Sequence, residues 1–242
     1  MRKRPVPFAL CLSLLAALFA GGCDLEPPVD CQQALAAGDA AWKEFDGEGA
    51  AKYYAMAVKA DPLNAGANWK LAQAYDRFRT PGRAECARAD GLALRYCRRA
   101  LDVAEDQGMK DSISRKLEIL EQLVNGKLEM PECAWAEISK NVRDKSGWDS
   151  IKVLAAAGRA TPVFYSEICK LDPAAADKNL QNAGRGMLVC RKILKDNDGK
   201  TFRAQLVLRN NKEFYTVWLT ANDRPAGFWR LESIQKTPEG KI

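Results

Sequence analysis

The chain contains no histidine among its 242 residues. Histidine is the usual base beside a serine or cysteine nucleophile, so the common Ser-His and Cys-His catalytic arrangements are excluded. Zinc sites of the Cys/His kind are excluded as well, and no Cys-x-x-Cys spacing offers an all-cysteine site. Carboxylates are plentiful, but none stands in a recognisable glycosidase, phosphate-loop or calcium-loop motif. We therefore expect no catalytic residue, no metal site and no cofactor, which predicts a protein that is not an enzyme.

The sequence also lacks an apolar run long enough to cross a membrane permanently. The N-terminal run from Phe8 to Ala20 has about 13 residues, whereas a spanning helix needs about 20. It follows the basic residues Arg2, Lys3 and Arg4 and leads into small residues, which is the order of a cleaved secretory signal. Residues 1–22 are therefore predicted to be a signal peptide, in preference to an uncleaved anchor.

Two glycines, Gly21 and Gly22, directly precede Cys23. This arrangement resembles the lipobox of bacterial lipoproteins, although Ala20 stands where leucine is usual. The resemblance implies cleavage before Cys23 and attachment of lipid, palmitate included, to its thiol. It also implies a lipid-anchored protein of the cell membrane or outer membrane that faces the periplasm. The alternative is an ordinary signal cleaved near Gly22, with Cys23 in a disulfide.

Residues 23–30 are short, acidic and contain two prolines, which is typical of an extended tether. We interpret them as the lipid anchor and tether. Asp24 follows the cysteine and is similar to the aspartate that keeps enteric lipoproteins in the inner membrane, so it favours that location.

Six cysteines remain once Cys11 leaves with the signal and Cys23 takes the lipid. An even number outside the cytoplasm indicates disulfides, although about 15 pairings of six cysteines exist and spacing alone selects none. Our candidate bonds join Cys169 to Cys190, ahead of the predicted sheet, and Cys86 to Cys97, where a bond would pin a loop.

Charge is distributed unevenly along the mature chain. We count about −3 for residues 23–130 and about +6 for residues 131–242. An excess this small does not indicate nucleic-acid binding, which needs a dense basic stripe. The basic C-terminal part is interpreted as a solvated face, with anionic headgroups or an acidic partner as the alternative.

Residues 31–128 carry a helical repeat pattern. Gly38, Ala50, Tyr54, Ala57 and Pro62 stand at spacings that resemble a tetratricopeptide repeat (TPR). Small residues let two antiparallel helices approach closely, and proline starts the turn to the next unit. The resemblance implies antiparallel helical hairpins that bind a peptide or helix in a groove. The alternative is a generic stack of alanine-rich hairpins.

A second unit starts after Pro62, and its second helix comes about nine residues later than the repeat requires. We therefore predict a loop insertion over residues 78–90. A capping helix is expected over residues 111–124, because apolar residues recur there at helical spacing. Trp42, Trp69 and Tyr75 are the candidate partner-binding residues, since a two-unit stack leaves an apolar face without neighbours.

Residues 131–242 predict an α+β domain. Helical patterns cover residues 132–142 and 147–157, and a less regular stretch extends to Gly186. Four strands are expected, and their predicted ranges are 187–195, 202–209, 213–220 and 228–234. Residues 227–235, GFWRLESIQ, are similar to the last strand of NTF2-like and cystatin-like domains.

The predicted fold class is therefore α + (α+β): antiparallel helical-hairpin repeats, then helices packed on a four-stranded antiparallel meander. The predicted function is a membrane-anchored adaptor that binds a protein or peptide partner on the extracytoplasmic side. The alternative is a ligand-binding lipoprotein with a pocket in the C-terminal domain. An open apolar groove on residues 31–128 would favour the first, and a closed pocket lined by Phe202, Trp218 and Trp229 the second.

Overall fold

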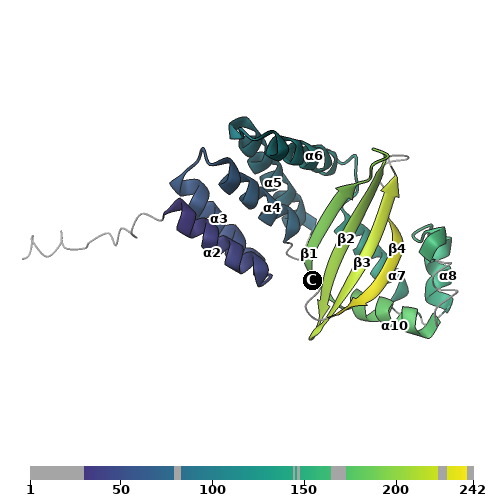
Figure 1. Ribbon diagram of the computed structural model, residues 1–242. Coiled ribbons are helices and arrows are strands. Elements are labelled where there is room, and N and C mark those ends of the chain that lie inside the picture. Colours follow the sequence, from purple (N-terminus) through teal and green to yellow (C-terminus); the bar gives the residue numbers. More distant parts are fainter. Residues whose placement is uncertain are drawn as a thin grey trace, which may run out of the picture.

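A computed structural model describes the greater part of the chain, namely residues 30–78, 83–143, 145, 148–164, 173–222 and 228–238. Helices come first, and a second group of helices packs with a four-stranded antiparallel sheet (Figure 1). The predicted α + (α+β) class is confirmed. Among the described helices, none combines the length and the apolar character that a membrane span requires.

The N-terminal helices form antiparallel hairpins, and their starts are fixed by capping side chains. Asp46, Asn64 and Asp106 each accept a hydrogen bond from the backbone N–H three residues ahead, at 2.6 to 2.9 Å. These caps set where the chain turns between helices. The helices are α2 (Cys31–Lys43), α3 (Gly47–Ala60), α4 (Ala65–Arg77), α5 (Arg83–Val103) and α6 (Gln107–Val124).

Close packing joins α2 to α3. The Tyr54 ring lies so near Gly38 that a Cβ on this glycine would overlap it. The Tyr54 hydroxyl donates a 2.7 Å hydrogen bond to Asp39, which also pairs with Lys70 of α4. Burial, followed by the Asp39 carboxylate, raises the pKa of Tyr54. The residues on which the repeat resemblance depends thus lie where the two helices meet.

The predicted loop insertion at residues 78–90 is largely wrong. Residues 83–90 belong to α5, which is 21 residues long. Their sequence, RAECARAD, consists mostly of strong helix formers, so the helix extends toward its N-terminus instead of leaving a loop. The capping helix α6 is also longer than predicted, because Asp106 starts it.

The C-terminal part follows the predicted order, but the stretch that was predicted to be irregular contains helical residues. Residues 173–184, predicted to be irregular, form a helix that packs on the sheet. The sheet is a meander with strand order β1-β2-β3-β4. The elements are α7 (Pro131–Val142), α8 (Trp148–Ala156), α10 (Pro173–Gly184), β1 (Met187–Lys195), β2 (Thr201–Asn210), β3 (Glu213–Asn222) and β4 (Arg230–Thr237).

The two faces of the sheet differ in what covers them. Phe202 and the alternate residues that follow it in β2 are buried on the face toward α7 and α10. Trp218 of β3 is on the other face and is partly exposed. The strand β3 is central, as predicted, but only one of its faces is well covered.

The hydrophobic core does not divide where the predicted domains meet. One cluster of buried residues contains Leu94 and Leu120 from the helical part together with Ile138, Leu206 and Leu219. A smaller cluster belongs to α2, α3 and α4. The boundary predicted between residues 128 and 131 lies between helices α6 and α7, and the main core continues across it.

Candidate binding groove

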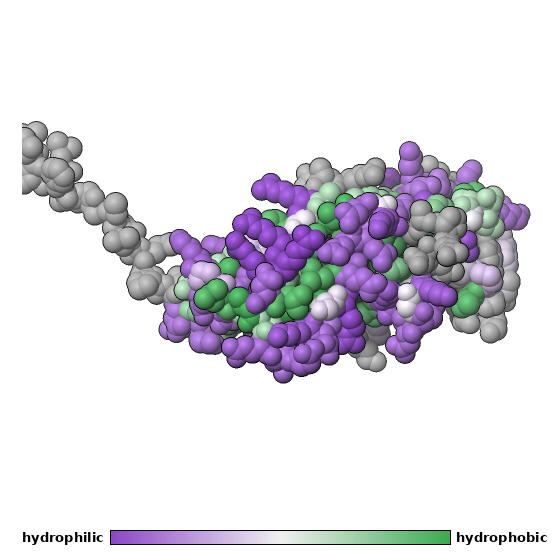
Figure 2. Space-filling view, turned by 90° about the horizontal axis from the view of Figure 1, so that it is seen from above, coloured by the Kyte–Doolittle hydropathy of each residue, from purple (hydrophilic) through white to green (hydrophobic). Residues whose placement is uncertain are grey.

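An open groove lies between the helical part and the edge of the sheet. It has a volume of about 610 Å³ and is walled by α4 and α6 on one side and β1 on the other, with Trp42 of α2 at one end. Seen from above, hydrophobic residues gather in a band over the helical half of the molecule, with hydrophilic residues along both sides (Figure 2). A volume of this size is within the roughly 300–1,000 Å³ of ligand sites.

Helical spacing explains the wall that α4 provides. Trp69, Gln73, Asp76 and Arg77 recur at three- and four-residue intervals, so they form one stripe, and all four line the groove. Between them Leu71 and other residues are fully buried on the opposite side of α4. The helix therefore faces the core with one stripe and the groove with another.

Aromatic and cationic groups meet at the end of the groove. Trp42 packs edge-on against Phe78, with ring centroids 5.0 Å apart and an angle of 78°. The Arg77 guanidinium lies 4.8 Å from the centroid of the Trp42 ring. These contacts fix the orientation of Trp42 while leaving the ring partly exposed.

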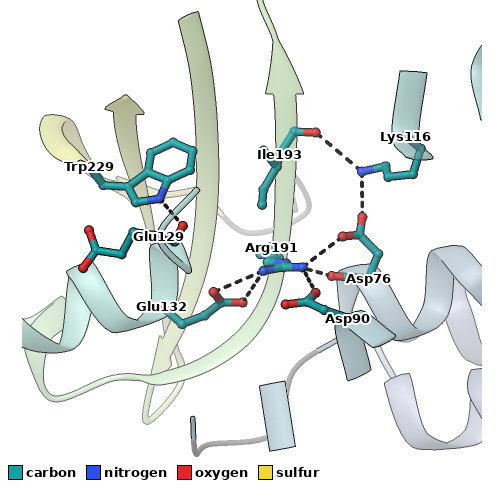
Figure 3. A network of polar contacts seen from close by, with 8 residues as sticks. All are labelled: Asp76, Asp90, Lys116, Glu129, Glu132, Arg191, Ile193 and Trp229. Carbon is teal, nitrogen blue, oxygen red and sulfur yellow. Dashed lines mark hydrogen bonds and ion pairs between the residues drawn. The ribbon is translucent and has the colours of Figure 1, made fainter. Parts of the chain in front are cut away.

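A buried arginine forms the floor. The Arg191 side chain of β1 is 0% exposed, and it binds Asp76 of α4, Asp90 of α5 and Glu132 of α7 (Figure 3). Lys116 of α6 binds the second oxygen of Asp76 at 2.7 Å. One strand is thereby attached to three helices, and burial of these charges is offset by their mutual pairing.

The buried environment near Asp76 changes the pKa of a cysteine thiol, that of Cys97. Cys97 of α5 is fully buried, and this burial, followed by the Asp76 charge, raises its pKa to about 12. The thiol therefore stays protonated at neutral pH and is a poor nucleophile.

The edge of β1 presents backbone groups to the groove. The Asp196 N–H donates to the Thr201 carbonyl at 2.8 Å, so it faces β2. Because antiparallel bonds alternate, the N–H and C=O groups of Ile193 and Lys195 face away from β2. The Lys116 ammonium approaches the Ile193 carbonyl to 3.5 Å from the far wall, which agrees with this direction.

Two of the three predicted partner-binding residues line the groove, and one does not. Trp42 and Trp69 are lining residues. Tyr75 instead stacks on Tyr96 of α5, with centroids 6.0 Å apart, and its pKa is raised chiefly by burial. Tyr75 belongs to the packing between α4 and α5, because its position on α4 is off the groove stripe.

The disulfide predicted between Cys86 and Cys97 is wrong. Both residues lie on α5, 11 positions apart, so their Cα atoms are about 16 Å from each other along the helix axis. A disulfide spans less than about 7 Å between Cα atoms.

The second predicted disulfide involves Cys190, which is buried in β1, where burial raises the pKa of its thiol. Its predicted partner Cys169, like Cys23, lies outside the described residues, so that pairing stays a prediction.

The aromatic residues of the alternative pocket do not come together. Phe202 and Trp229 are at most 1% exposed and belong to the main core. Trp218 is on the opposite face of the sheet, with the Arg203 guanidinium 5.4 Å from its ring centroid. Within the described residues, no group of three or more cysteine, aspartate or glutamate side chains is arranged so that it could hold a metal ion.

The part that β1 plays in the groove was not predicted. The sequence signal for this role is Arg191, which occupies an inward position of β1 between the apolar residues Leu188 and Ile193. A charge at such a position has to find a buried partner, but the sequence does not say which carboxylate supplies it.

No family model, curated protein or solved structure matches this chain.

Proposed function

We propose that the protein is a lipid-anchored adaptor, which holds a partner protein close to a bacterial membrane on its extracytoplasmic side. The signal-like N-terminus and Cys23 support the anchor. The observation that carries the binding role is the open groove in which Trp42 and Trp69 stay partly exposed. Large aromatic side chains that line a concave surface are typical of the residues that dominate protein interfaces.

The arrangement of the groove favours binding over catalysis. Its charged floor is held by ion pairs with fixed partners, and its polar lining comes from basic, acidic and amide side chains and one serine. Such groups bind and orient a chain. No nucleophile with an activating base lies among the groove residues.

Site-specific photo-crosslinking tests this role. A photoreactive residue replaces Gln73, which lines the groove, in the full-length lipidated protein in its own membranes. The matched control replaces Lys152 of α8, whose side chain is 75% exposed and does not line the groove. We expect a discrete protein adduct from position 73 alone, and its loss when Trp69→Ala is added. Equal adducts at both positions, or none at position 73, would contradict the proposal.

The anchor is tested separately. Cys23→Ser removes the acceptor thiol, so the protein should move from the membrane to the soluble fraction. A variant that still fractionates with membranes at full-length mass would identify an uncleaved helix instead of a lipid.

A further inference from the structure

The groove has features of a site for an extended peptide. Its β1 wall is an outer strand of the sheet, and the N–H and C=O groups of Ile193 and Lys195 are directed into the groove. The Ile193 carbonyl has a long, 3.5 Å contact with the Lys116 ammonium, which the N–H of an added strand would replace. Unpaired groups on a sheet edge are a template for another strand. A ligand that used only side-chain contacts would not need these backbone groups, so their presence favours an extended peptide.

The chain already pairs with this edge once. Phe78, the residue after α4, forms an isolated antiparallel bridge with Cys190. The groove begins immediately beyond this bridge and follows β1 from Arg191 to the turn at Asn197. An added strand of about five residues would be about 17 Å long and would fill the interval from Arg191 to Lys195.

Charge indicates what kind of segment fits. Six lysine and arginine residues line the groove against three acidic residues. Asp76 is already bound by Arg191 and Lys116, and Glu118 is bound by Lys195. Among the described residues, no carboxylate lies within ion-pair distance of the groove cations Arg77, Arg115 and Lys192. The groove therefore has basic groups to offer to a ligand, and an acidic partner complements them.

We propose, building on the adaptor function above, that the groove binds an acidic, extended segment of a partner protein, which adds as a fifth strand to the free edge of β1. Alternate side chains of this segment face Trp69 and the helices, and the others lie beside Lys192. Backbone hydrogen bonds to Ile193 and Lys195 hold the segment, and charge selects it.

The test uses the full mature chain with Cys23→Ser and a fluorescent synthetic peptide of alternating glutamate and valine. Lys195→Pro removes the edge N–H, which β2 does not use, so the sheet should tolerate it. Lys195→Val is the matched control, because it also loses the ammonium but keeps the N–H. We expect binding to Lys195→Pro to be about tenfold weaker than binding to Lys195→Val. A peptide N-methylated at alternate residues should lose affinity for the unaltered protein to a similar extent, which tests the same bonds without changing the fold.

The preference for an acidic segment is tested by reversing the charge of the peptide and then the charge of Lys192. A lysine-valine peptide should bind at least about tenfold more weakly than the glutamate peptide, and Lys192→Glu should reduce that difference. Equal affinities for Lys195→Pro and Lys195→Val would overturn strand addition, and so would an unaffected N-methylated peptide. No binding of the glutamate peptide at about 1 mM, the weak end of specific affinity, would overturn the acidic partner.

Two other occupants of the β1 edge, a second copy of the chain and its own acidic tether, would give different results. A dimer seen by sedimentation and abolished by Lys195→Pro would mean that a second copy occupies the edge. Peptide binding that appears only after residues 24–29 are deleted would mean that the acidic tether occupies it. Either result overturns the proposal. The adaptor function is judged independently, because the adduct at position 73 does not depend on how the partner binds.

Discussion

The buried arginine of β1 offers the sharpest test of how the sheet is attached to the helices. Arg191→Met removes the guanidinium that Asp76, Asp90 and Glu132 share, while keeping a long apolar side chain in the same space. Removing one partner of a buried ion pair costs about 3–5 kcal/mol, because buried charge loses its compensation. Native domains have only about 5–15 kcal/mol of stability, so this loss is a large fraction of the total.

The matched control is another arginine of the same sheet. Arg203 of β2 makes a two-point contact with Glu232, at 2.6 and 3.2 Å, but its side chain is 41% exposed. Solvent screening makes exposed pairs worth less than about 1 kcal/mol. Arg203→Met should therefore cost much less than Arg191→Met, although both variants remove a bound guanidinium.

Urea unfolding followed by circular dichroism and tryptophan fluorescence measures both costs. Arg191→Lys should fall between the two variants, because an ammonium keeps the charge but cannot reach three carboxylates from three helices as a planar fork does. A cost below about 1 kcal/mol for Arg191→Met, or equal costs for Met at positions 191 and 203, would refute the argument that burial makes this network important.

Packing and titration support four further predictions. Gly38→Ala should destabilise the protein by about 1–3 kcal/mol, because its Cβ would overlap Tyr54. In contrast, Gly91→Ala should stabilise it by about 0.5–1 kcal/mol, because open space surrounds Gly91 in α5; urea unfolding measures both. Under reducing conditions the free energy of unfolding should fall as pH rises from 9 toward 12, since the pKa of Cys97 is raised to about 12 in the folded state and unfolding lets the thiol ionise. Urea unfolding at several pH values should show a smaller fall for Cys97→Ala. Finally, residues 131–242 expressed alone should show no cooperative unfolding by circular dichroism, because the main core continues into the helical part; a sharp transition would contradict this.

Local patterns in the sequence were sufficient for most elements. The alternation from Phe202 to Leu208 predicted β2, and the structure buries that face as expected. The last residues of α6 and α7 were also predicted correctly, although α6 begins four residues earlier than predicted. The α10 helix was missed because its sequence, PAAADKNLQNAG, has few large apolar residues to show a period. Its stability comes from packing on the sheet, which local pattern does not reveal.

The groove itself was only half predictable. Trp42 and Trp69 could be named as exposed aromatic residues of an incomplete helical stack, and both line the groove. The opposite wall is β1, and the contact between Asp76 and Arg191 joins residues 115 positions apart. No local signal in one sequence encodes a pairing at that separation. The same reasoning explains the error at Tyr75, since only the three-dimensional arrangement decides which stripe of α4 faces outward.

The proposed lipid anchor and the groove fit one mode of action. A strand addition of about five residues makes few hydrogen bonds, each contributing only about 0.5–1.5 kcal/mol, so its affinity is weak in solution. Attachment to the same membrane as the partner raises the effective concentration toward the millimolar range, which compensates for weak binding. The seven steps of chain from Cys23 to Asp30 can span at most about 25 Å, and α2 adds about 17 Å between Cys31 and Trp42. In the proposed arrangement, the partner segment therefore has to come within about 42 Å of the lipid. Loss of the lipid through Cys23→Ser should accordingly reduce capture of the partner in cells far more than it reduces affinity for a peptide in solution.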